Sequence, residues 1–84
     1  MLKILYFARL KESLGIAQEE YPFTDGIKDV ASLVSMLRSR GGKWETELNL
    51  DQTVRVAVNQ DLGNSSSPIH DGDEVAFFPP VTGG

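Results

Sequence analysis

The feature that most limits the fold of this chain is one amphipathic helix without a second long helix to pack against. Apolar side chains recur at helical spacing and form a stripe on one side of the helix. The stripe consists of Ile27, Val30, Leu33, Val34 and Leu37. Asp29 is a typical N-cap residue, and Gly41 and Gly42 are typical helix-ending residues. In a chain of 84 residues, we expect a small sheet to cover the stripe.

Four segments rich in β-forming residues surround this helix. They are residues 2–9, 18–23, 53–59 and about 74–78. Pro22 cannot donate a ladder hydrogen bond, so the second strand is expected at a sheet edge. "RLKESLG" (residues 9–15) is expected to form a helical turn that ends at Gly15. The order β-β-α-β-β predicts an α+β, β-grasp (ubiquitin-like) domain over residues 1–78, because a ferredoxin-like fold needs a second long helix.

Composition excludes several classes of function. The chain has no cysteine, which excludes a disulfide framework, a thiolate zinc site and a cysteine nucleophile. Its 12 acidic residues against 8 basic ones argue against nucleic-acid binding, which usually needs a basic face. No segment approaches the roughly 18 apolar residues needed to cross a bilayer, and no secretory cleavage site follows the N-terminus. We therefore expect a soluble cytoplasmic protein with no membrane partner.

The domain offers little for catalysis or metal binding. His70 is the only histidine, so a two-histidine metal site is impossible and we expect no metal. Asp71 and Asp73 flank Gly72 in a pattern typical of a plain turn, although a weak calcium turn is an alternative. The Gly41–Gly42 pair follows a helix, whereas a phosphate-binding glycine loop precedes one. We expect no catalytic side chain in the domain.

The strand alternation predicts an apolar surface on the side of the sheet away from the helix. If the other apolar strand residues face the helix, five side chains face outward, where a half-exposed sheet should be polar. They are Leu5, Phe7, Ala57, Ala76 and Phe78. Such a face is a candidate partner surface. The alternatives are that loops cover it or that the alternation has the opposite sense.

Residues 79–84 are predicted to form an extended C-terminal tail. Pro79 and Pro80 stiffen its start, and Val81 and Thr82 continue it. Gly83 and Gly84 lack side chains, so this end could enter a narrow channel, with a terminal carboxylate as its functional group. Adenylation by ATP would activate the carboxylate, and a sulfur donor could then displace AMP to leave a thiocarboxylate. A frayed terminus is the plain alternative.

Three segments resemble the small subunit of molybdopterin synthase, the MoaD type. "DGDEVAFFPPVTGG" (residues 71–84) resembles its C-terminus, and "VAVNQ" (residues 56–60) its central strand and turn. "LKILYFARLKESLG" (residues 2–15) resembles its opening. The resemblance covers nearly the whole chain and is weakest at about residues 41–52 and at "DLGNSSS".

The resemblance implies a sulfur carrier that is the non-catalytic subunit of a transferase. Gly84 would be adenylated by an enzyme related to ubiquitin activators, which uses ATP, and then converted to a 1-thioglycine thiocarboxylate. No cofactor would be bound. The tail would enter the large subunit, which holds the catalytic lysines, and give its sulfur to cyclic pyranopterin monophosphate. Two small and two large subunits would form a heterotetramer, in which Phe7, Leu62 and Phe78 face the partner.

Three other functions stay open from the sequence. A sulfur carrier for thiamine synthesis shares the Gly-Gly end, but the preceding "FFPPVT" argues against it. A ubiquitin-like modifier would use the same activated carboxylate to form isopeptide bonds with lysines. A plain interaction domain would have an inert tail.

Overall fold

A mixed five-stranded sheet forms the centre of the computed structural model, which describes residues 1–50 and 54–80. The strands are β1 (Leu2–Tyr6), β2 (Gln18–Tyr21), β3 (Arg55–Val58), β4 (Asp61–Leu62) and β5 (Glu74–Phe78). Their order across the sheet is β2-β1-β5-β3-β4. The central strands β1 and β5 are parallel, and the other neighbours are antiparallel. As Pro22 predicted, β2 lies at an edge of the sheet.

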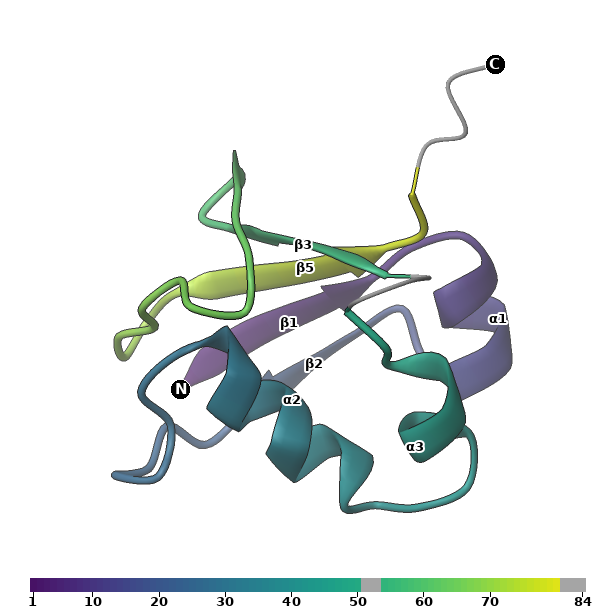
Figure 1. Cartoon of the computed structure of the whole chain (residues 1–84), viewed down its shortest axis with the longest axis horizontal. Coiled ribbons are helices and arrows are strands. Elements are labelled where there is room, and N and C mark those ends of the chain that lie inside the picture. The colour runs from purple at the N-terminus through teal and green to yellow at the C-terminus, as the bar shows by residue number, and fades with distance from the viewer. Residues whose placement is uncertain (51–53, 81–84) are drawn as a thin grey trace.

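The helices lie on one side of this sheet and at one end of it. They are α1 (Arg9–Leu14), α2 (Val30–Arg38) and α3 (Lys43–Glu47). Figure 1 shows α2 crossing one face of the sheet, with α3 beside it and α1 at the end where β1 finishes. This arrangement confirms the predicted β-grasp fold, in which a sheet wraps around one main helix. The short elements α3 and β4 were not predicted.

Local hydrogen bonds decide where α2 begins. The Asp29 carboxylate accepts from the Ser32 amide at 2.9 Å, and the Ser32 hydroxyl accepts from the Asp29 amide at 3.1 Å, which forms a capping box. The cap confirms Asp29 as the N-cap, but it places Ile27 before the helix, where that side chain is still buried. The helix ends at Arg38, and Gly41 and Gly42 form the turn into α3 with positive φ.

The core lies between the sheet and the helices. Its buried side chains are Leu2, Ile4, Tyr6, Leu10, Ile27, Val30, Leu33, Val34, Leu37, Leu48, Val54, Val56, Ile69, Val75 and Phe77. Alternate residues of β1 and β5 are buried, which confirms the predicted sense of the strand alternation. β1 ends earlier than predicted because Ala8, with φ of 52°, turns the chain into α1. Gly15 ends α1 in a left-handed conformation, as predicted.

A polar network closes the end of the core beneath the last residues of β1 and β5. The Glu19 carboxylate accepts two hydrogen bonds from Arg40, at 2.8 and 2.9 Å, and one from the Tyr6 hydroxyl at 2.7 Å. The Arg40 guanidinium lies 4.3 Å from the centre of the Trp44 ring, a cation–π contact. Burial raises the pKa of Glu19, but the hydrogen bonds from Arg40 and Tyr6 outweigh it and lower this pKa overall. The network joins β2 to the segment that follows α2.

We expect this network to make stability depend on pH in the acid range. Because the pKa of Glu19 is lower in the folded chain, its contribution is complete above the ordinary value of 4.5 and is lost as pH falls through the folded value. Glu19→Gln should cost about 1 kcal/mol at pH 7, since the site is partly exposed and screened. Urea unfolding between pH 3 and 7 measures this. A Glu19→Gln variant whose stability falls with acid as steeply as the parent's would contradict the prediction.

Candidate functional site

The outward face of the sheet carries a row of apolar residues that crosses four strands. In register, Leu5 lies beside Ala76, Ala76 beside Ala57, and Ala57 beside Leu62. These positions alternate with the buried ones, so the row lies on the side of the sheet away from the core. Leu62 is 75% exposed. The row is a continuous apolar strip on the face that the helices leave open.

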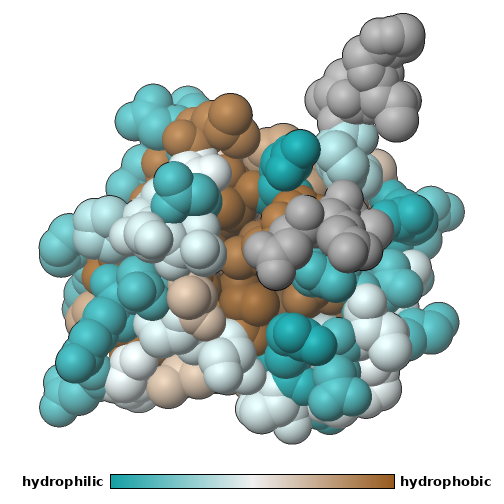
Figure 2. Space-filling view, viewed as in Figure 1, coloured by the Kyte–Doolittle hydropathy of each residue, from teal (hydrophilic) through white to brown (hydrophobic). Residues whose placement is uncertain are grey.

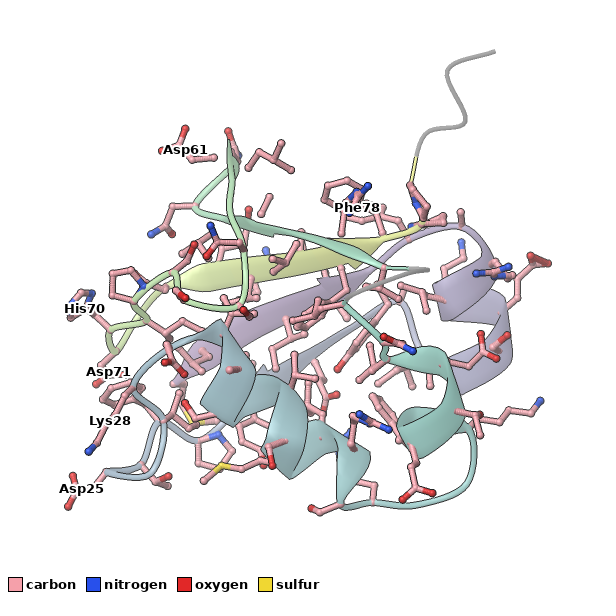
Figure 3. All side chains as sticks on the ribbon, viewed as in Figure 1. Asp25, Lys28, Asp61, His70, Asp71 and Phe78 are labelled. Atoms are coloured by element: carbon pink, nitrogen blue, oxygen red, sulfur yellow. The ribbon has the colours of Figure 1, made fainter. Side chains whose placement is uncertain are left out.

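A second row lies one step closer to the tail. Phe78 is in register with Arg55, and the Phe7 amide donates to the Phe77 carbonyl at 3.1 Å. Phe7 is 47% exposed and Phe78 is partly exposed. Figure 3 shows Phe78 on the opposite side of the sheet from α2. We call Leu5, Phe7, Ala57, Leu62, Ala76 and Phe78 the outer apolar face.

Polar and charged residues border this face. One step beyond the apolar row, Lys3 is in register with Glu20 on one side and Glu74 on the other. At the tail end, Arg55 is exposed. Figure 2 shows apolar surface over the β3–β4 hairpin among polar atoms. An apolar centre with a charged border is typical of a protein–protein interface.

The β3–β4 hairpin places Leu62 on the outer apolar face. Asn59 and Gln60 link the two strands with φ of 51° and 71°, a conformation that suits a two-residue hairpin turn. The turn reverses the chain so that Leu62 pairs with Ala57. Reasoning from strand alternation missed Leu62, because "NQ" lacks the glycine that usually marks such a turn. The resemblance alone had predicted it.

The three residues predicted to face a partner lie on one side of the molecule. Phe7 follows β1, Leu62 ends β4 and Phe78 ends β5, and all three are at least partly exposed. This placement agrees with the prediction from alternation for Phe7 and Phe78. Contact with a partner stays a prediction for all three residues.

Two prolines follow the last strand of the outer apolar face. β5 ends at Phe78, and Pro79 and Pro80 are partly exposed and outside any strand. A proline has no amide hydrogen to donate, so the strand ladder cannot continue through these two residues. The predicted tail residues Val81, Thr82, Gly83 and Gly84 lie outside the described residues, so the extended tail and the boundary at 78/79 stay predictions.

The other candidate residues form an ordinary turn. His70 is 79% exposed, and Gly72 adopts a φ of 91° between Asp71 and Asp73. The Asp73 carboxylate accepts from the His70 amide at 2.8 Å, as expected for plain turn chemistry. Across residues 1–50 and 54–80, no group of three His, Cys, Asp or Glu side chains could hold a metal ion. No helix in this part of the chain is long and apolar enough to cross a membrane.

A β-grasp body whose open sheet face leads into a Gly-Gly sequence defines a ubiquitin-like carrier class. The comparisons with known proteins agree. The chain belongs to the ThiS family, whose model matches residues 4–84. It is 39% identical to the molybdopterin synthase sulfur carrier subunit of Escherichia coli K12, over the full length of both chains.

The chain is also similar to several solved structures that share its fold. A putative molybdopterin converting factor subunit 1 from Pyrococcus furiosus matches with a TM-score of 0.79 and 32% identity, covering 95% of this chain and 97% of that one. A complex of subunits 1 and 2 of the molybdopterin-converting factor from Helicobacter pylori matches with a TM-score of 0.65 and 25% identity, covering 99% and 97%. Small archaeal modifier protein SAMP1 from Haloferax volcanii gives 0.69 and 28%, covering 99% and 98%.

Proposed function

We propose that this chain is the sulfur carrier subunit of a molybdopterin synthase. The observation that carries the proposal is the similarity to the Escherichia coli carrier, which extends over the full length of both chains. The fold agrees, because the described domain offers an open apolar face to a partner. In this proposal the chain supplies sulfur, and the catalytic groups belong to its partner.

The sulfur is held at the carboxylate of Gly84. An oxygen of this carboxylate attacks the α-phosphorus of ATP in an activating enzyme related to ubiquitin activators, and pyrophosphate leaves. With hydrosulfide as the sulfur donor, its sulfur attacks the acyl carbon, AMP leaves with its electron pair, and the S–H proton is lost to solvent. The product is the 1-thioglycine thiocarboxylate at Gly84. Its sulfur goes to cyclic pyranopterin monophosphate to build the dithiolene of molybdopterin.

The partner that receives this tail is the large synthase subunit. The Helicobacter pylori relative is described in complex with subunit 2, which supports a partner of this kind. The outer apolar face, with Phe7, Leu62 and Phe78, is the surface that docks onto the partner. Because Phe78 directly precedes the tail, docking of this face directs residues 79–84 into the partner. Two small and two large subunits make the complete enzyme.

The mass of the chain tests the sulfur chemistry. After incubation with ATP, the activating enzyme and a sulfur source, we expect one oxygen of Gly84 to be replaced by sulfur, seen in the intact chain and in its C-terminal fragment. The same mixture without ATP is the control and should leave the mass unchanged. An unchanged mass with an activating enzyme that is active on another carrier would contradict the proposal.

Protein modification is the second candidate function, favoured by the similarity to SAMP1. A modifier forms an isopeptide bond through the same activated carboxylate, so the body of the chain does not separate the two functions. The fate of Gly84 does. A free thiocarboxylate consumed by the large subunit supports the carrier, and Gly84 attached to lysines of other proteins supports the modifier.

A further inference from the structure

Asn59 links the β3–β4 hairpin to the start of β5. Its side-chain oxygen accepts from the Glu74 amide at 3.0 Å, and its side-chain nitrogen donates to the Asp73 carboxylate at 3.0 Å. Its own amide donates to the Glu74 carbonyl at 2.7 Å. One residue therefore makes three hydrogen bonds to the two residues that begin and precede β5.

Asp73, which accepts the hydrogen bond from the Asn59 side chain, is itself held by other hydrogen bonds. The second oxygen of Asp73 accepts from the His70 amide at 2.8 Å, and the Asp73 carbonyl accepts from Lys3 of β1 at 3.0 Å. Burial raises the pKa of Asp73, but the hydrogen bonds from Asn59 and from the His70 amide outweigh it and lower this pKa overall. The Asn59–Asp73 hydrogen bond thus has a charged acceptor, which makes it stronger than a neutral one.

The hairpin that this link holds is short and strained. β4 has two residues and pairs with β3 alone, and both turn residues have positive φ without being glycine. Such a backbone persists where surrounding contacts hold it, and strain of this kind gathers at functional sites. Leu62 lies three residues after Asn59 and is 75% exposed, so no packing of its own fixes its position.

We propose that Asn59 is a positioning residue, which holds the hairpin against Asp73 and so presents Leu62 to the large subunit. The inference rests on the proposed function, in which Leu62 contacts that subunit. Without the Asn59 side chain, the hairpin takes up more orientations, and the fraction of chains ready to bind falls. The apparent dissociation constant rises in proportion to that loss.

A double-mutant cycle tests this by titrating the full chain into the large subunit. Asn59→Gly removes both side-chain hydrogen bonds but still permits the positive φ of 51°. It should weaken binding by about tenfold, as expected for the loss of two net hydrogen bonds. In a Leu62→Ala background the same change should cost less than about twofold, because Asn59 acts through Leu62. Equal effects in both backgrounds would overturn the proposal.

Two further variants separate positioning from general stability. Asn64→Gly makes the same change in the segment that follows β4, where the side chain accepts from the Ser66 amide at 2.8 Å, and it should leave affinity unchanged. Asn59→Asp places two carboxylates together and should weaken binding. The double variant Asn59→Asp with Asp73→Asn has the donor at position 73 and the acceptor at position 59. It should therefore recover affinity. Failure of this recovery would overturn the proposal.

The outcomes also separate this inference from the proposed function. If Leu62→Ala weakens binding and Asn59→Gly does not, the positioning role is wrong and the carrier function stands. If Leu62→Ala leaves the affinity unchanged, Leu62 is not in the interface, and the positioning proposal falls with that assignment. The Gly84 mass measurement does not depend on either residue, so it judges the carrier function by itself.

Discussion

A chain without Gly84 is expected to lose sulfur transfer completely and to unfold at the same temperature as the full chain. The shortened tail ends at Gly83, and one residue spans at most about 3.6 Å, so the new carboxylate falls short of the reacting position by roughly that distance. A displacement of this size is large for a reaction that depends on alignment. No core side chain in the described residues lies beyond Phe77, so the fold should not change.

Two measurements check this expectation. Thermal unfolding followed by circular dichroism tests the fold, and molybdopterin formation with the large subunit and chemically thiocarboxylated chains tests transfer. Supplying the thiocarboxylate chemically removes the activating enzyme from the comparison, so a loss of product reports on delivery alone. Sulfur transfer by the shortened chain at the rate of the full chain would rule out a working role for Gly84.

Phe78→Asp is expected to weaken binding to the large subunit by at least about a hundredfold. Phe78 lies at the root of the tail, and docking there would bury the new carboxylate without a partner, at a cost of about 3 kcal/mol or more. Binding can be measured by calorimetric titration below the melting temperature of every variant. The loss of affinity should come mainly from faster dissociation of the complex.

Ser35→Asp is the matched control for this substitution. It adds the same single negative charge at an exposed position of α2, on the other side of the sheet from Phe78 (Figure 3). We expect an affinity close to that of the parent chain. Equal weakening by both substitutions would assign the effect to net charge, and unchanged binding by Phe78→Asp would show that the outer apolar face is not the interface.

The strand and helix patterns predicted most of this fold because each pattern depends only on residues close together in the sequence. The β-forming run at residues 74–78, followed by two prolines, gave the bounds of β5. Asp29 gave the start of α2, since its carboxylate bonds to an amide only three residues away. β4 was not predicted, because its two residues pair with β3 through a turn of unusual sequence. α3 has only five residues, too few to show a helical period.

The same distinction applies to the candidate site: local patterns predicted some of its residues, and others depend on tertiary contacts. Alternation identified Phe7 and Phe78, because the side of a strand on which a residue lies follows from its position in the pattern. It could not identify Leu62, which reaches the same face only after the chain reverses at Asn59 and Gln60. Nor could it predict the Asn59–Asp73 hydrogen bond, which joins residues 14 positions apart.

The sequence by itself determined the fold class and the buried side of the main strands, and it predicted the chemistry at Gly84, because periodicity, capping and functional groups belong to short segments. The tertiary structure alone decided the strand order, the joining of Phe7, Leu62 and Phe78 into one face, and the Glu19–Arg40 pair. These features depend on contacts between segments distant in the chain. Such contacts form only when the whole sheet closes over α2, and no local pattern encodes them.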